Sequence, residues 1–248
     1  MTHSVSVFDY QHHTFPALID LRGTTLLPEA RGTLGLLGKV GDLDAKAEFT
    51  GIPPATQFGA EYLTYVLWAI TPEGRPVNIA EILVQGTAAR LVAPSGKPKV
   101  TTDLKAFGLV VTAEPYFAVT TPSGMVIMEN KARPEANGRP EDSEAKYDVL
   151  PKGYYTMEVN PQEVHPVAAD PGVTFEILEA RNAVRIARWA DADSYAPESL
   201  GAAVLLLRQA EVEQAGKKPD SKRVMKAARE AVEIAEDARV FALKRKSR

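Results

Sequence analysis

The pattern of apolar and polar positions changes character near residues 170–175 of this 248-residue chain. Before that point the sequence consists of short apolar runs punctuated by Pro and Gly. After it, alanines and larger apolar residues recur every three or four positions up to the C-terminus. Short runs separated by turn residues are typical of strands, and the later spacing is typical of helices. The chain is therefore expected to be a β-rich body followed by a helical tail.

The clearest strand pattern is residues 43–49, where four apolar side chains alternate with three charged ones. Residues 61–70 are the most apolar and aromatic run, which predicts a central strand. Thr71-Pro-Glu-Gly74 predicts a type I turn that returns the chain along 77–84 as a hairpin. Further short strands are expected at 100–102, 107–114, 117–120, 125–129 and around 154–159, with an edge strand or loose arm at 1–15. Strands of this number and length predict an antiparallel β-sandwich or barrel.

The tail divides into three predicted helices. The first covers about 175–190, the second begins at Pro197 and ends before Gly216, and Asp220 or Ser221 caps the third. Its stripe of Val224 and six alanines repeats at helical spacing, which allows close helix approach but buries little area.

Residues 131–146 are polar and rich in Pro, Gly and acidic side chains, which predicts a loop or linker. The fold class predicted is thus α+β: an antiparallel, Ig-like β-sandwich with a C-terminal three-helix tail. The domain prediction is a β-sandwich domain at 1–130, a linker and extended connector at 131–174, and an Ala-rich helical domain at 175–248.

Charge is distributed unevenly along the chain. From residue 177 onward there are 15 Lys/Arg against 11 Asp/Glu, a net charge of +4, whereas the preceding residues carry 14 against 21, a net charge of −7. A mildly basic tail favours contact with an acidic surface, although salt screens such a field within about 8 Å. The absence of cysteine excludes disulfides, thiolate catalysis, zinc–thiolate sites and iron–sulfur clusters.

No apolar run approaches the roughly 20 residues that a membrane-spanning helix needs. The first residues lack the basic region and apolar segment of a signal peptide. The localisation expected is periplasmic or extracellular with the signal peptide removed, and cytoplasmic is the alternative.

Residues with catalytic or ligand-binding chemistry do not converge in the sequence. His12 and His13, with His3 nearby, are read as solvated polar residues and not as metal ligands, because neighbouring strand positions point to opposite faces. The glycines of 32–38 have the wrong spacing for a dinucleotide-binding loop and are read as bends between short β segments.

The carboxylates Glu73, Glu81 and Glu114 lie near predicted strand ends, where surface solvation is the expected role. Trp68 is expected to pack in the core. The prediction is therefore no catalytic residue, no metal site and no cofactor.

The interaction candidates lie on the first predicted tail helix. Arg181, Arg185 and Arg188 form a basic row at i, i+4 and i+7, which can contact phosphates but is also typical of a solvated helix face. Because the chain is acidic overall, nucleic acid is not the partner predicted. Trp189 either marks a contact surface or anchors the helix partly buried.

Two parts of the chain resemble known families. Tyr62-Leu-Thr-Tyr-Val-Leu-Trp-Ala-Ile-Thr-Pro-Glu-Gly74, then 79–84 and Phe107-Gly-Leu-Val-Val-Thr-Ala-Glu-Pro115, resemble the extracytoplasmic β-sandwich of the anti-sigma-K-factor type. The resemblance covers about 23–130. The family's sigma-binding helices and transmembrane helix are absent from this sequence, so the resemblance implies a β-sandwich with an envelope location and not sigma-factor regulation.

The tail, at about 175–243, is similar to an uncharacterised alanine-rich helical family of bacterial envelope proteins. The similarity rests on Glu179-Ala-Arg-Asn-Ala-Val184, Tyr195-Ala-Pro-Glu-Ser-Leu200 and Ala227-Ala-Arg-Glu-Ala-Val-Glu-Ile-Ala-Glu-Asp-Ala-Arg239. Some members of that family occur beside a peptidoglycan-binding domain of the outer-membrane-protein-A type, and no such domain follows here. Neither resemblance supplies catalytic residues.

These observations predict a non-enzymatic bacterial cell-envelope interaction or structural protein. Its expected partner is another protein or a second copy of the chain, with cell-wall or membrane-surface contact as an extension. The alternatives are a small-ligand-binding or carboxylate-dependent enzyme domain with a pocket lined by Glu73, Glu81, Glu114 or Tyr154, and an envelope sensor related to anti-sigma factors.

Overall fold

The computed structural model describes residues 1–9, 17–39, 42–86, 88–97, 100–131, 143–168 and 172–247. The chain divides into two compact units. The β unit contains Met1–Phe58, Thr64–Glu114 and Thr120–Lys152, and the helical unit contains Gly59–Leu63, Pro115–Val119 and Gly153–Arg248. Two short segments that interrupt the β unit in sequence therefore belong to the helical unit.

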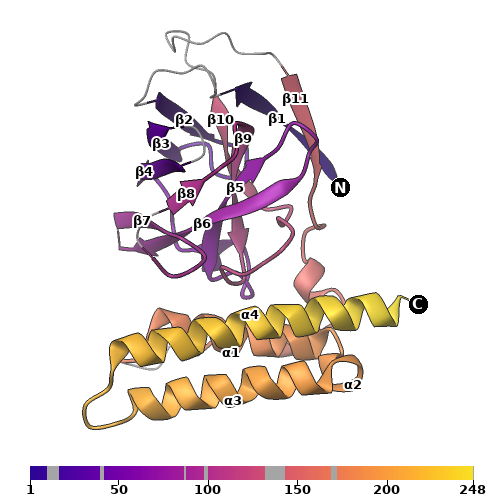
Figure 1. The fold of residues 1–248 in the computed structure, drawn as a ribbon. Helices are drawn as coiled ribbons and strands as arrows, with labels where there is room; N and C mark the ends of the chain where they lie inside the picture. Colours follow the sequence, from indigo (N-terminus) through magenta and orange to yellow (C-terminus); the bar gives the residue numbers. More distant parts are fainter. Residues whose placement is uncertain are drawn as a thin grey trace. The chain divides into compact units, whose positions relative to one another are not determined.

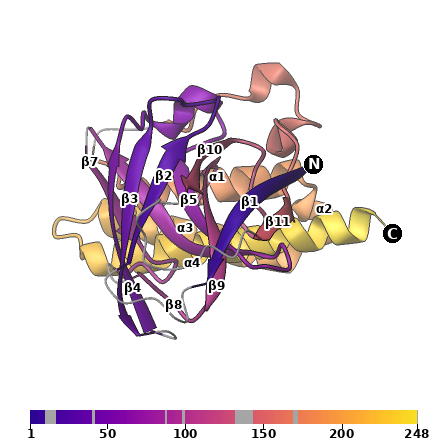
Figure 2. The ribbon, with the colours of Figure 1, turned by 90° about the horizontal axis from the view of Figure 1, so that it is seen from above.

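The β unit is one antiparallel sheet that nearly closes into a barrel (Figure 1). Its main path runs β7-β6-β5-β9-β10-β2-β3-β4-β8, and β4 near one end of this path contacts β7 at the other. β1 pairs with both β9 and β11, and Figure 2 shows β1 beside β11. The described strands are β1 (Thr2–Asp9), β2 (Ala17–Gly23), β3 (Arg31–Lys39), β4 (Asp42–Thr50), β5 (Thr64–Ile70), β6 (Pro76–Gln85), β7 (Ala88–Val92), β8 (Val100–Thr102), β9 (Ala106–Glu114), β10 (Val126–Lys131) and β11 (Ser143–Asp148).

The predicted α+β class and antiparallel body are confirmed. β5 lies between β6 and β9, and all seven of its residues are buried, as a central strand requires. In β4, Lys46 and Glu48 are exposed and Phe49 is buried, so the described side chains follow the predicted alternation. The predicted turn after β5 is also present: the Gly74 N–H donates to the Thr71 carbonyl at 2.8 Å.

Gly74 is required at its position for two reasons. Its φ of +82° lies in the left-handed region that glycine adopts without strain, and a Cβ there would lie 1.9 Å from the Lys146 carbonyl oxygen of β11. The hairpin turn and β11 thus approach each other closely only because residue 74 carries no side chain.

Several sequence expectations are wrong in the β-rich part. The glycines of 32–38 are not bends, because they lie inside β3, where a Cβ on Gly32 would approach the Phe49 ring to 2.9 Å. Residues 117–120 form no strand, and the strand expected around 154–159 is instead a 3₁₀ turn, Tyr154–Thr156. The expected linker 131–174 contains β11, and the rest of its polar stretch, 132–142, lies outside the described residues.

The helical unit contains the three predicted helices and one short extra one. They are α1 (Phe175–Trp189), α2 (Ala192–Tyr195), α3 (Pro197–Gln214) and α4 (Ser221–Lys246), with 3₁₀ turns η2 (Tyr154–Thr156) and η3 (Pro161–Glu163); η1 (Ala55–Phe58) belongs to the β unit. In Figure 1, α4 runs alongside α1 and α3. Pro197 is the first residue of α3, and the Asp220 side chain accepts from the Lys222 and Arg223 N–H groups, as predicted.

The alanine stripe of α4 is buried, which lets neighbouring helices approach closely. Its buried members include Ala228, Ala231, Ala235, Ala238 and Ala242, each 0% exposed. Among the described residues, none of the helices has the length and apolar character needed to cross a bilayer.

Two titratable groups lie near β1, one on β10 and one on β11. Tyr147 of β11 is buried, and its pKa is raised by burial and by the nearby Glu129 carboxylate of β10. Burial also raises the pKa of Glu129, while His3 and Lys131 act in the opposite direction. The ionised form of Glu129 is thus disfavoured by folding.

Substitution of Glu129 tests this effect through the pH dependence of stability. Because the folded-state pKa is raised, the stabilising contribution of Glu129 is present below its unfolded pKa of about 4.3 and is lost as pH rises through the folded value. Glu129→Gln should therefore raise the thermal unfolding midpoint at about pH 7 and change it little at about pH 3. The exposed Glu48→Gln is the control, and circular dichroism is the measurement. An equal effect of Glu129→Gln at both pH values would contradict the assignment.

Candidate interaction surface on the helical unit

The arginine row of α1 is held mostly by the chain itself. Arg181 Nε donates to Glu211 Oε1 of α3 at 2.8 Å. Arg185 donates to Asn182 Oδ1 at 2.6 Å and to the His165 carbonyl at 2.5 Å. Burial lowers the pKa of Arg185, although the nearby Glu61 carboxylate opposes the change.

Arg188 is the exposed member of the row and lies 4.0 Å from Asp193. The row therefore does not form the solvated face that the sequence indicates, and two of its three guanidinium groups are engaged within the helical unit. A row engaged in this way offers little to a phosphate backbone, since each contact would compete with an internal one.

Trp189 serves as a helix anchor and also lines a small hollow. It is half-buried, and the Arg185 guanidinium lies 4.6 Å from the centre of its ring. The hollow measures about 170 Å³ and is mainly apolar; it is lined by Tyr154, Tyr155, Met157, Glu158, Val159, Ile186, Trp189, Ala190, Arg239 and Leu243. At its edge, Lys246 bonds to Glu158 and to Asp191, and these bonds raise the Lys246 pKa. We call this feature the Trp189 hollow.

Beneath α1, buried side chains bind the main chain of the two inserted segments. The Asn182 amide donates to the Glu61 carbonyl at 2.7 Å and to the Pro115 carbonyl at 2.9 Å. The Phe117 N–H donates to Glu179 Oε1 at 2.8 Å. Asn182 and Glu179 are both 0% exposed, so they satisfy main-chain groups that water does not reach.

A buried ion pair on α4 binds the second inserted segment, Pro115–Val119, through the Tyr116 hydroxyl. Arg239 donates to Glu236 through Nε at 2.6 Å and through a terminal nitrogen at 2.8 Å, and the Tyr116 hydroxyl donates to the same carboxylate at 2.7 Å. Burial raises the pKa of Tyr116, and the negative charge of Glu236 adds to the increase. Although burial opposes it, hydrogen bonding to Glu236 raises the pKa of Arg239. Arg229 stacks 3.5 Å from the centre of the Phe117 ring.

We call Tyr116, Glu179, Asn182, Arg229, Glu236 and Arg239 the buried polar cluster. The sequence patterns did not predict this cluster, although one signal was present: charged residues interrupt the alanine stripe of α4 at 229, 236 and 239. The groups that most resemble a catalytic set in the helical unit are thus bonded to the chain's own segments.

The carboxylates considered as candidates in the β unit have different environments. Glu73 is exposed, as expected, but Glu81 and Glu114 are 1% and 0% exposed, so their predicted solvation is wrong. Glu81 accepts from the Thr64 hydroxyl at 2.9 Å. Glu114 accepts from the Thr112 hydroxyl at 2.5 Å and from the Ser123 N–H at 2.6 Å.

The same network explains Trp68, which is a core residue as predicted. Its indole N–H donates to the Thr112 hydroxyl at 2.8 Å, and its side chain is 1% exposed. His12 and His13 lie outside the described residues, and His3 lies in β1 beside the Tyr147 ring. Within the described ranges, no three His, Asp or Glu side chains are grouped as a metal site would require.

The largest exposed apolar residues of the helical unit include two on α3. Leu205 is 68% exposed and Val212 is 66% exposed, one heptad apart on the side of α3 opposite its buried residues Ala203 and Ala210. With Ala202 and Gln209 they follow the spacing 3, 4, 3, and we call these four residues the outer face of α3. A helix that is apolar on two sides normally buries both.

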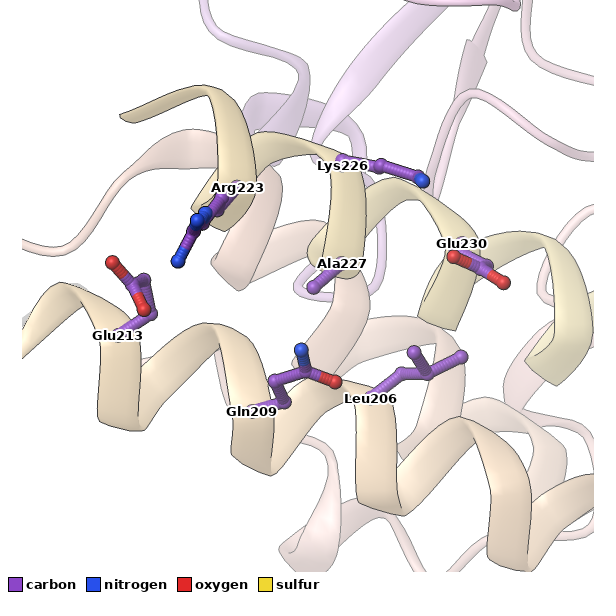
Figure 3. Close-up of a pocket in the computed structure, with 7 residues that line it drawn as sticks. All are labelled: Leu206, Gln209, Glu213, Arg223, Lys226, Ala227 and Glu230. Carbon is purple, nitrogen blue, oxygen red and sulfur yellow. The ribbon is translucent and has the colours of Figure 1, made fainter. Parts of the chain in front are cut away.

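A groove of about 330 Å³ lies beside the outer face, between α3 and α4. Figure 3 shows Leu206 and Gln209 of α3 pointing toward α4, and Ala227 of α4 pointing toward α3. The rim carries both signs of charge, with Arg223 facing Glu213. Its lining residues are Leu206, Gln209, Glu213, Arg223, Lys226, Ala227 and Glu230, and we call it the α3–α4 groove.

Comparison with protein-family models, with curated proteins and with solved structures finds no match for the chain. The two family resemblances therefore stay predictions. The surface chemistry of the outer face of α3 and the α3–α4 groove has to be interpreted from the residues themselves.

Removal of the Asn182 side-chain amide should lower the stability of the helical unit more than the small size of that group suggests. Asn182→Ala leaves two buried carbonyls without their donor, which should lower the free energy of unfolding by about 2–4 kcal/mol. Urea denaturation followed by far-ultraviolet circular dichroism measures the change. The exposed Arg188→Ala is the control and should stay within about 0.5 kcal/mol of the parent. Equal effects of the two substitutions would contradict the role given to Asn182.

The buried ion pair should show strong coupling in a double-mutant cycle. Glu236→Gln or Arg239→Met alone strands a buried charge and should cost about 3–5 kcal/mol, while the double variant should cost much less than the sum. Tyr116→Phe should cost about 1–2 kcal/mol, because it removes one hydrogen bond to the carboxylate. The matched control is the exposed pair of Arg188 and Asp193, where coupling should stay below about 1 kcal/mol. Additive effects at Glu236 and Arg239 would refute a bonded pair.

Proposed function

We propose that the chain is a non-enzymatic interaction or structural protein of the bacterial cell envelope that acts through its helical unit. The observation that carries the proposal is the outer face of α3, where Leu205 and Val212 are about two-thirds exposed beside a groove. Exposed apolar side chains next to a polar-rimmed groove are typical of protein-binding surfaces.

The environment of the reactive side chains also supports an interaction protein. The buried carboxylates Glu81, Glu114, Glu179 and Glu236 each accept hydrogen bonds from the chain's own hydroxyl, amide or guanidinium groups. Carboxylates bound in this way stabilise the fold. A reaction that used one of them would first have to break its hydrogen bonds.

The Trp189 hollow bears on the small-ligand alternative. Its volume of about 170 Å³ is below the roughly 300–1,000 Å³ typical of small-molecule sites. That size favours the insertion of one side chain from a protein partner. The envelope location itself rests on the two family resemblances given by the sequence.

Association and envelope binding of the full chain test the proposal together. Sedimentation velocity over a wide concentration range should reveal association of the chain with itself, or co-sedimentation should reveal binding to purified peptidoglycan or to vesicles containing anionic phospholipid. A chain that stays monomeric at every concentration and remains in the supernatant with both materials would overturn the interaction role.

Cell fractionation of the native host tests the location separately. An antibody against the chain should detect it in the periplasmic, envelope or secreted fraction, with a cytoplasmic and a periplasmic marker protein as references. Recovery confined to the fraction of the cytoplasmic marker would refute the envelope assignment and leave the interaction role to be judged by the association measurements.

A further inference from the structure

The outer face of α3 has the pattern of a helix-pairing seam. Ala202, Leu205, Gln209 and Val212 occupy successive positions spaced 3, 4 and 3 residues apart, as a and d positions do in paired helices. The opposite side of α3 packs inside the helical unit through the buried Leu200, Ala203 and Ala210. Within the described part of the helical unit, α3 therefore has one buried apolar side and one exposed apolar side.

The seam lies directly beside a recess that fits it. Leu206 and Gln209 line the α3–α4 groove; Leu206 follows Leu205 in sequence, and Gln209 lies one helical turn from both Leu205 and Val212. A protruding apolar row and an adjacent groove on one face form a self-complementary surface, because two-fold rotation places each row over the groove of the other copy.

We propose that this surface binds a second copy of the chain, with Leu205 and Val212 of each protomer inserted into the α3–α4 groove of its partner. The inference deepens the proposed interaction function and rests on it. Reciprocity favours a second copy over an unrelated protein, because one face supplies both the row and the groove.

The charges around the seam agree with pairing of two copies. The exposed Arg208 lies between Leu205 and Val212 in the sequence, while the groove rim carries the carboxylates Glu213 and Glu230. Insertion of the row into the partner's groove brings Arg208 toward that rim. The face as a whole carries both signs, with Arg208, Arg223 and Lys226 against two carboxylates, whereas a membrane-binding face is expected to be uniformly basic.

Substitution of the seam should abolish the dimer without unfolding the chain. Leu205→Glu and Val212→Glu place charges that are exposed in the monomer but buried in the dimer, so each should weaken association by at least about tenfold in sedimentation velocity. The thermal unfolding midpoint measured on dilute protein should not fall. Leu18→Glu is the matched control, because Leu18 is a 49% exposed leucine of the β unit.

Charge reversal tests the pairing of specific residues. Arg208→Glu and Glu230→Arg should each weaken the dimer, and the two substitutions combined in one chain should restore it. Both side chains are exposed in one copy, and rescue would show that the two charges lie close together in the dimer.

The absence of cysteine provides a direct proximity assay. In the two-fold arrangement Gln209 lies between the row and the groove, close to its counterpart. A Gln209→Cys chain should form a disulfide-linked dimer under mild oxidation, and the exposed Arg90→Cys of the β unit should not.

These experiments distinguish failure of the α3 seam from failure of the proposed interaction function. Dimers that persist in Leu205→Glu and Val212→Glu, with no cross-link through residue 209, would overturn the α3 seam and leave self-association through another surface. A parent chain that is monomeric at every concentration would also overturn the seam, while binding to peptidoglycan or vesicles would still support the proposed function.

Discussion

The structure depends on one requirement of physical chemistry, which is that buried main-chain groups must find hydrogen-bond partners. The segments Gly59–Leu63 and Pro115–Val119 lie inside the helical unit without forming a regular element of their own. Their carbonyl and amide groups are bonded by Asn182 and Glu179, and the Tyr116 hydroxyl is bonded by Glu236. These buried polar side chains of α1 and α4 thus bond the chain's own inserted segments.

The helices accommodate these segments because α4 presents alanine at most inward positions. Small side chains let the helices approach closely, and the charged side chains at 229, 236 and 239 fill the places where a segment must be bonded. α3 differs in that its outer face exposes large apolar side chains. On α3, the apolar Leu205 and Val212 lie on the side opposite the buried Ala203 and Ala210.

The periodicity of apolar residues predicted most regular elements of this chain. It did not predict the contacts between segments that are distant in the sequence. The hairpin of β5 and β6, the Asp220 cap and the start of α3 at Pro197 depend on a few neighbouring residues, which local sequence rules describe. Residues 117–120 have strand-like composition, but their partners are side chains far along the chain. The glycines in β3 looked like bends because the Phe49 ring that requires Gly32 lies on the next strand.

The candidate interaction surface was harder to predict from the sequence for a similar reason. Trp189 and the arginine row attract attention by residue type, yet tertiary contacts hold Arg181 and Arg185 internally. Leu205 and Val212 look like ordinary helix-core residues until packing shows which side of α3 faces α4. Exposure depends on how the helices rotate about their axes, and composition carries little information about that rotation.

The discontinuous make-up of the helical unit also governs how the protein can be synthesised. Asn182 lies 121 residues after Glu61 and 67 after Pro115, and Glu236 lies 120 residues after Tyr116. At roughly 5–20 residues per second of translation, the early segments emerge several seconds before the helices that enclose them. Until then Tyr116 and Phe117 lack the side chains that bury them in the finished fold, so a chain truncated before α4 would leave both aromatic rings exposed.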